Sequence, residues 1–164
     1  MKNTALWVLS ILVGLNLILT LSLSVKLTGK TSKEIEGELA NPLPSYVTKT
    51  VISDIGNKLI DAHNSRDIET EWNLYGEYAQ AQMNKEKFSE DTGKVYDLFG
   101  PVLDIKYMYH EYAGKTGNLV FYNLFFKAKL TDHCQLSETA TMKITIAGDG
   151  SDTQIVAFRM DSDS

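Results

Sequence analysis

Residues 88–110 read FSEDTGKVYDLFGPVLDIKYMYH, and this stretch decides the predicted fold. Up to Phe99 its apolar residues recur at helical spacing. The pair Gly100-Pro101 ends a helix, because glycine suits the position after the last turn and proline cannot continue it. Beyond Pro101 apolar and polar residues alternate, which predicts a strand with one face in water. The chain therefore changes from helix to sheet at this point.

Two further helices are predicted before this junction. Apolar residues at helical spacing predict the first over Val51–His63. The second is expected over residues 67–83, with Asp67 as its N-cap. Ser89 is the expected N-cap of the third helix, because two acidic residues follow it at the positive end of the helix dipole.

Four strands are expected after the junction. The last three are predicted over Leu119–Leu130, Leu136–Ile146 and Gln154–Met160. In the first strand, strict alternation from Leu103 places His110 on the polar, exposed face.

Helices followed by hairpin-linked strands predict an α+β fold, with two or three helices packed on a curved antiparallel sheet of about four strands. This element order, with a helix entering through FSEDTGKVYDLFGPV, resembles the NTF2-like superfamily, which is cystatin-like and cone-shaped. The resemblance covers about Val51 to Met160 and is greatest to small bacterial members of unknown function with an N-terminal membrane segment. It implies a cone whose interior serves isomerase or dehydratase chemistry in some members, and binding or assembly in others.

The beginning of the chain predicts a membrane anchor. Residues 5–25 read ALWVLSILVGLNLILTLSLSV and carry no charge. As a helix they span about 30 Å, the thickness of the hydrocarbon core of a bilayer. We therefore expect residues 1–26 to form a single-pass transmembrane anchor, with the lipid bilayer as a partner of residues 5–25.

Two questions about this segment stay open. Ser22 and Ser24 form a small-x-small site, so a cleaved signal peptide would leave a secreted binding protein beginning at Val25. Lysines at 26, 30 and 33 favour a cytoplasmic domain by the positive-inside rule, whereas a short basic start before an apolar run is typical of export. We expect the C-terminal domain to be extracytoplasmic.

The remaining chain divides into a tether and a domain. Residues 27–46 are polar and end in Pro42 and Pro44, which favour extended chain over helix. The alternative is that residues 33–40 prolong the membrane helix. Residues 47–164 form the expected NTF2-like α+β domain. The net charge of −5 argues against a nucleic-acid partner.

Candidate catalytic residues are few. By strand parity, Glu111 and Glu138 share a face with apolar residues, and a carboxylate in an apolar pocket has a raised pKa that suits a general base. Tyr107 could donate a hydrogen bond to an oxyanion. The alternative is that both glutamates lie at strand ends in solvent, because unpaired buried glutamates are rare.

No cofactor and no metal site are expected. The chain has one cysteine, so a four-cysteine zinc site is excluded. Asp132-His133-Cys134 places three possible ligands side by side. Adjacent residues of extended chain point to opposite faces, so they cannot converge on one ion without a tight turn.

The strand predicted over residues 119–130 is apolar on both faces over most of its length, unlike its half-polar neighbours. Either the fold wraps around both faces or a second copy covers the outer one, and we hypothesise a homodimer. The interface candidates are Phe121, Tyr122, Leu124 and Phe125.

The predicted function is a non-enzymatic, membrane-anchored binding or assembly domain of the cell envelope. It would use its cone or its outer sheet face to bind an unknown protein partner or a small apolar ligand. Two alternatives are a pocket isomerase or lyase that uses Glu111 or Glu138, and a secreted binding protein.

Overall fold

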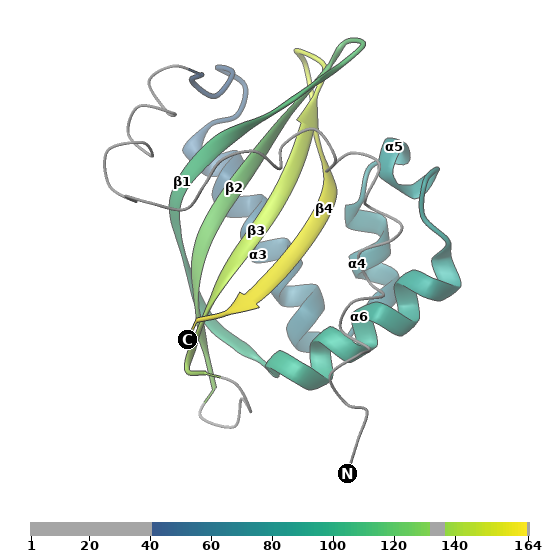
Figure 1. The fold of residues 1–164 in the computed structure, drawn as a ribbon, viewed down its shortest axis with the longest axis vertical. Helices are drawn as coiled ribbons and strands as arrows, with labels where there is room; N and C mark the ends of the chain where they lie inside the picture. Colours follow the sequence, from purple (N-terminus) through teal and green to yellow (C-terminus); the bar gives the residue numbers. More distant parts are fainter. Residues whose placement is uncertain (1–40, 132–136, 164) are drawn as a thin grey trace, which may run out of the picture. The chain divides into compact units, whose positions relative to one another are not determined.

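The computed structural model describes residues 41–131 and 137–163, which form four helices and one sheet (Figure 1). The predicted anchor over residues 5–25 and most of the tether lie outside these residues. The α+β class and the antiparallel sheet of four strands are confirmed. The elements are α3 (Lys49–Ser65), α4 (Ile68–Leu74), α5 (Glu77–Gln80), α6 (Lys85–Phe99), β1 (Val102–Thr116), β2 (Leu119–Leu130), β3 (Thr139–Gly148) and β4 (Thr153–Ser162).

Helix α3 runs behind the sheet in Figure 1 and covers one of its faces. The side chain of Thr48 caps the helix by accepting a hydrogen bond from the Val51 amide at 3.3 Å. Arg66, at φ 55°, ends it in the left-handed conformation. Gly56 permits the close approach to the sheet, because a Cβ there would lie 2.7 Å from the Ile105 side chain.

The second predicted helix is interrupted, and Asp67 caps only its first part. The Asp67 carboxylate accepts from the Thr70 amide at 2.9 Å, as expected of an N-cap. The helix then stops before Gly76, whose amide donates to the Ile155 carbonyl at 2.9 Å. Tyr75 pairs with Ile155 as well, in a parallel bridge. Residues 75 and 76, which the periodicity assigns to a helix, therefore pair with the edge of β4 instead.

Helix α6 begins earlier than predicted. Its N-cap is Asn84, whose side-chain oxygen accepts from the Lys87 amide at 2.7 Å. Ser89 lies inside the helix, so its assignment as N-cap was wrong. Serine and asparagine are both good N-caps, and the helix begins at the earlier of the two residues. Gly100 ends the helix at φ 64°, as the sequence predicts.

The sheet has the order β1-β2-β3-β4, and all its neighbours are antiparallel. We call the face that α3 covers the inner face and the opposite one the outer face. The inner face forms the centre of the core, because eight of its residues on β2 and β3 are at most 1 % exposed. These are Leu124, Phe126, Ala128, Leu130, Ala140, Met142, Ile144 and Ile146.

A β-bulge at Met108 changes which side chains of β1 face inward. Tyr107 pairs with Phe126, but Tyr109 pairs with Phe125, so one extra residue lies between them. A shift of one residue exchanges the two faces of a strand. His110 is therefore only 8 % exposed, and its expected place on the exposed face was wrong.

The end of the predicted tether belongs to the fold. The Tyr122 hydroxyl donates to the Pro42 carbonyl at 3.3 Å, and Leu43 and Tyr46 pack against the core. No helix within residues 41–131 and 137–163 combines the length and apolar character that a bilayer crossing requires.

Candidate functional site

The outer face carries a row of four side chains across the sheet. Strand register aligns Tyr109 of β1 with Phe125 of β2, Lys143 of β3 and Arg159 of β4. The two rings stack, with centroids 4.6 Å apart and planes at 14°. We call these four residues the central row. It is aromatic on β1 and β2 and cationic on β3 and β4.

The next row toward the C-terminal end of β2 is also charged. It consists of Lys106, Lys127, Thr141 and Asp161, which we call the second row. Like charges lie directly opposite each other in both rows, Lys106 against Lys127 and Lys143 against Arg159. Such pairs destabilise a sheet unless a counter-charge lies close.

Carboxylates on the sheet itself compensate half of these cations. Asp163 binds Lys127 at 2.5 Å, and Asp161 binds Arg159 at 2.6 Å. Among the described residues, Lys106 and Lys143 have no such partner.

Helix α5 of the same chain covers one end of the outer face. Phe121 is 5 % exposed, and its ring lies 5.8 Å from that of Tyr78 in α5. Ala147, its neighbour on β3, is fully buried. Helix α5 thus explains part of the apolar character that the sequence shows on both faces of β2. No described helix covers the central row.

A hollow of about 270 Å³ adjoins the second row. Its charged lining comprises Lys106, Lys127, Lys129, Asp104 and Glu138. Both signs of charge line this hollow, so it does not select a simple anion or cation.

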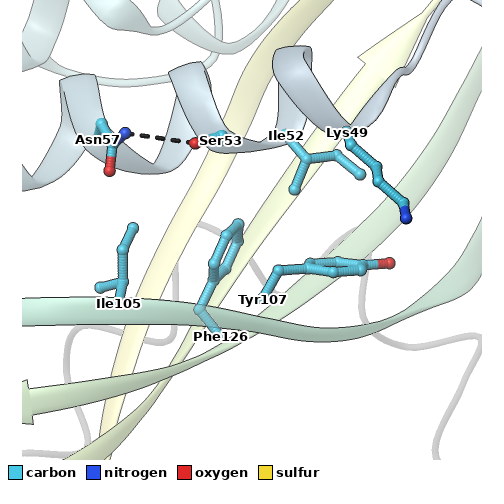
Figure 2. Close-up of a pocket in the computed structure, with 7 residues that line it drawn as sticks. All are labelled: Lys49, Ile52, Ser53, Asn57, Ile105, Tyr107 and Phe126. Atoms are coloured by element: carbon cyan, nitrogen blue, oxygen red, sulfur yellow. Dashed lines mark hydrogen bonds between the residues drawn. The ribbon is translucent and has the colours of Figure 1, made fainter.

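A second cavity lies between α3 and the inner face (Figure 2). Its volume is about 190 Å³, and Ile52, Ile105 and Phe126 supply its apolar walls. Lys49 and Tyr107 lie at the same end of this groove in Figure 2. Ser53 and Asn57, which also line it, are hydrogen-bonded to each other at 3.4 Å.

Tyr107 is fixed by a short hydrogen-bonded chain. Its hydroxyl lies 2.9 Å from Nδ1 of His110, and Nε2 of His110 lies 3.3 Å from the Asn41 carbonyl. A proton on Nε2 satisfies both contacts: Nε2 donates to the carbonyl and Nδ1 accepts from the tyrosine. Tyr107 therefore helps to hold residue 41 against the sheet.

The three catalytic candidates are not brought together. Glu111 and Glu138 are both exposed. Glu111 pairs with Asn123, and the two glutamates lie on opposite sides of the central row. The bulge at Met108 is the reason that Glu111 does not share the apolar face. Tyr107 lies on the inner face, so no two of the three share a pocket.

The four interface candidates divide between the two faces. Tyr122 and Leu124 belong to the inner face, where both are buried and cannot contact a second copy in this fold. Phe121 lies under Tyr78. Only Phe125, which is half-buried in the central row, can contact another molecule.

A buried polar cluster that the sequence analysis missed lies among the helices. Glu71 of α4 is 2 % exposed, and the Tyr96 hydroxyl donates to its carboxylate at 2.8 Å. Burial raises the pKa of Glu71 to about 7, which the hydrogen bond only partly opposes. Burial also raises the pKa of Tyr75, and the Glu71 charge adds to this. The spacing of Glu71 from Ile68 and Tyr75, on one helical face, is the signal that could have revealed it.

His63 completes this cluster. Its ring lies 4.8 Å from that of Tyr96, edge to face, and its Nε2 donates to the Gly100 carbonyl at 2.8 Å. Burial lowers the pKa of His63, so the ring is neutral near pH 7. The cluster lines neither cavity, and it joins α3 to α6.

Metal ligands do not gather in the described part of the chain, where no group of three or more His, Cys, Asp or Glu side chains could hold an ion. The trio Asp132-His133-Cys134 lies outside the described residues.

Comparison with known proteins leaves the family open. No family model matches the chain, and no curated protein matches it. Among solved structures, one described as "Structure of Bdellovibrio bacteriovorus Bd1075" is similar, with a TM-score of 0.41 and 11 % sequence identity. The similarity covers 70 % of this chain and 40 % of that one.

Proposed function

We propose that this chain is a non-enzymatic binding or assembly domain, which residues 5–25 anchor in the cell membrane and which binds a protein partner through its outer sheet face. The observation that carries the proposal is the central row. It combines two stacked aromatic rings with two cations on a face that no described helix covers at that position. Aromatic and arginine side chains are enriched in the centres of protein interfaces.

The positions of the acidic side chains support a non-catalytic role. Glu111 and Glu138 lie apart in solvent, where neither has the apolar surroundings that a general base near neutral pH requires. Glu71 has a suitable pKa but lies outside both cavities. The isomerase or lyase alternative is tested by Glu111→Gln and Glu138→Gln once a substrate is known.

The groove under α3 supports a second candidate, the binding of a small apolar ligand. Its walls are apolar and Lys49 lies at one end, but about 190 Å³ is below the roughly 300–1,000 Å³ of common ligand sites. A short fatty acid such as octanoate is the appropriate probe. We expect Ile105→Trp, which fills the groove, to abolish any octanoate binding that calorimetry detects with the full chain.

The membrane anchor, the extracytoplasmic position and the NTF2-like assignment belong to the same proposal. Carbonate extraction of membranes distinguishes an integral anchor from a cleaved signal: an anchored chain stays in the pellet. A mature product that begins at Val25 would instead support the secreted binding protein.

Site-specific photo-crosslinking in the membranes of the source cell tests the binding surface. A photoreactive residue at position 125 lies in the central row, whereas one at the exposed position 58 on α3 serves as a matched control. We expect a discrete crosslinked protein band from position 125 and none from position 58. Equal labelling from both positions, or none from position 125, would contradict the proposal.

A further inference from the structure

We propose that residues 67–83, which we call the flap, open when Glu71 loses its proton and thereby uncover the end of the outer face that α5 covers. The inference rests on the proposed function, because it concerns the regulation of the same binding surface. It follows from the path of the flap, which carries α4 and α5 and joins the other helices to the outer face of the sheet.

The flap passes around the edge of β4 (Figure 1). Its first helix, α4, packs against α3 and α6. The chain then meets the edge of the sheet, where the Gly76 amide donates to the Ile155 carbonyl at 2.9 Å. The second helix, α5, places the ring of Tyr78 against that of Phe121 on the outer face, with centroids 5.8 Å apart. A movement of α4 away from its neighbours therefore also moves the cover of Phe121.

Both ends of the flap are suited to bending. Arg66, immediately before it, ends α3 at φ 55°. Residues 81–83 form a turn at the other end, before Asn84 caps α6. Helix α4 has seven residues and α5 has four, and helices this short are not stable in water without tertiary contacts. The flap therefore keeps its structure only while its contacts with the rest of the fold hold.

Contacts with α6 and β4 hold the flap closed. The Tyr96 hydroxyl of α6 donates to the Glu71 carboxylate at 2.8 Å. Trp72 and Tyr75 each contact the ring of Phe88 in α6 edge to face, with centroids 5.1 and 5.3 Å apart. The backbone pairing with β4 completes the set. Among these contacts only that of the carboxylate depends on pH near neutrality, because the rings and the backbone stay uncharged there.

The surroundings of Glu71 provide no counter-charge. Within the described residues, no cationic side chain lies at ion-pair distance from its carboxylate. Arg66 binds Asp97 at 3.0 Å on the surface instead. The titratable groups around Glu71 are Asp67 and Tyr75 of the flap, His63 and Arg66 at the end of α3, and Tyr96 of α6.

Ionisation of Glu71 therefore opposes the closed flap. Because Glu71 is 2 % exposed, water reaches its carboxylate only when α4 moves away. Burial raises the pKa of Glu71 from 4.5 to about 7, so the closed flap retains a proton that an open, hydrated carboxyl releases. The ratio of open to closed flap should thus rise about tenfold between pH 6 and pH 8.

Opening of the flap enlarges the proposed binding surface. Phe121 is buried under Tyr78, and its cross-strand neighbour Ala147 is fully buried. Phe121 shares the outer face of β2 with Phe125, so the uncovered area adjoins the central row. Added apolar area beside aromatic and cationic side chains strengthens a protein interface. A protein partner should therefore bind more tightly at pH 8 than at pH 6.

Hydrogen exchange of the full chain in detergent micelles, followed by mass spectrometry, tests the flap. Peptides from residues 67–83 report its opening, whereas peptides from β2 and β3 report global unfolding. After correction for the intrinsic pH dependence of exchange, we expect opening of the wild-type flap to rise about tenfold from pH 6 to pH 8, relative to Glu71→Gln. His63 is present in both chains, so the comparison isolates the carboxylate. Glu77→Gln, at an exposed position of α5, is the matched control and should retain the wild-type pH dependence.

Two results of the exchange experiment would overturn the proposal. Protection of the flap equal to that of β2 and β3 would show that it opens only when the whole fold unfolds. A parallel pH dependence of the wild type and Glu71→Gln would show that the carboxylate does not control it. If Glu71→Gln does not fold, the wild type decides alone. Flap protection that falls from pH 6 to pH 8, and stays well below that of the strands, supports the proposal, and protection that does not fall overturns it.

Photo-crosslinking from position 125 in membranes at pH 6 and pH 8 tests the link to binding. We expect a stronger partner band at pH 8 in the wild type and equal bands in Glu71→Gln. Equal bands at both pH values in the wild type would overturn the regulatory role. No band at either pH overturns the proposed function and this role with it, whereas unchanged exchange overturns the flap alone.

Discussion

The two faces of the sheet are built from the same strands, yet they differ in what they can do. On β2, Phe126 of the inner face is 1 % exposed under α3, while its neighbour Phe125 of the outer face is half-buried against Tyr109. The inner face of β2 and β3 contains no charged residue, whereas Lys127 and Lys143 lie on the outer face. Burial under a helix excludes charge, because an unpaired charge loses its hydration there.

The two faces should therefore differ in how much they contribute to the stability of the fold. A face that is completed by the chain's own helices contributes stability, and changing it costs folding. The outer face, with cations beside aromatic rings that are only half-buried at the central row, contributes less stability. Substitutions on the two faces should therefore differ in their cost to stability.

Deletion of Met108 should have the largest effect. Without the extra residue of the bulge, one half of β1 must present its side chains to the wrong face. Either His110 or the inner-face residues that precede the bulge would then turn away from the core. We therefore expect the cooperative unfolding transition in circular dichroism to be lost. Met108→Ala keeps the bulge and is the control. A deletion variant that melts cooperatively near the wild type would show that β1 tolerates either register.

Phe126→Ala should cost more than Phe125→Ala, although the two residues are adjacent. The buried ring leaves a cavity in the core, which lowers the free energy of unfolding by about 3–5 kcal/mol. The outer ring loses a stacked pair and part of its burial, at about 0.5–1.5 kcal/mol. Urea denaturation of both variants measures the difference. Equal losses in the free energy of unfolding would mean that both faces of the sheet contribute equally to the stability of the fold.

Glu71→Gln should stabilise the protein above neutral pH. The pKa of Glu71 is raised from 4.5 to about 7 in the folded state, so the folded chain holds a proton that the unfolded chain has lost between these values. The stability that the folded chain gains from this bound proton is complete below pH 4.5, declines as pH rises and is lost above pH 7. At pH 8 the variant should gain up to about 3 kcal/mol.

Thermal unfolding from pH 5 to pH 8 provides the measurement for Glu71→Gln. The stability of the wild type should fall relative to the variant across this range. Exposed Glu69, on the same helix, provides the control: Glu69→Gln loses a surface ion pair with Lys85 and should gain no stability at pH 8. A parallel profile for Glu71→Gln and the wild type would show that Glu71 ionises normally.

Asp163→Asn should have the smallest effect. The variant loses the ion pair with Lys127, but that lysine is 44 % exposed and the pair is screened by water. We expect a loss below about 1 kcal/mol, which is within the usual range for such pairs. A loss of several kcal/mol in urea denaturation would show that outer-face charges stabilise the fold itself.

The elements that depend on local signals could be predicted from the sequence. The break at Gly100, the N-cap at Asp67 and the limits of β2 follow from propensity and alternation within a few residues. The elements that depend on distant contacts could not. Glu71 was missed as a buried group because its hydrogen-bond partner, Tyr96, comes from a different helix, 25 residues further along the chain.

The candidate site was predictable only in part. The sequence indicated an unusual β2 and placed Phe125 among the interface candidates, and the structure gives that residue an outward position. The sequence could not show that Lys143 and Arg159 lie beside it, because that row depends on the register of three separate strand pairs.

By itself the sequence determined the class of the fold, the change from helix to sheet at Gly100 and the approximate bounds of β2, β3 and β4. Tertiary structure alone decided that Gly76 leaves a helical path to pair with Ile155, and that a bulge at Met108 turns His110 inward. The physical reason is the range of the forces. Helix caps and side-chain periodicity act over one or two turns, whereas edge pairing and register are fixed by residues that are far apart in the chain.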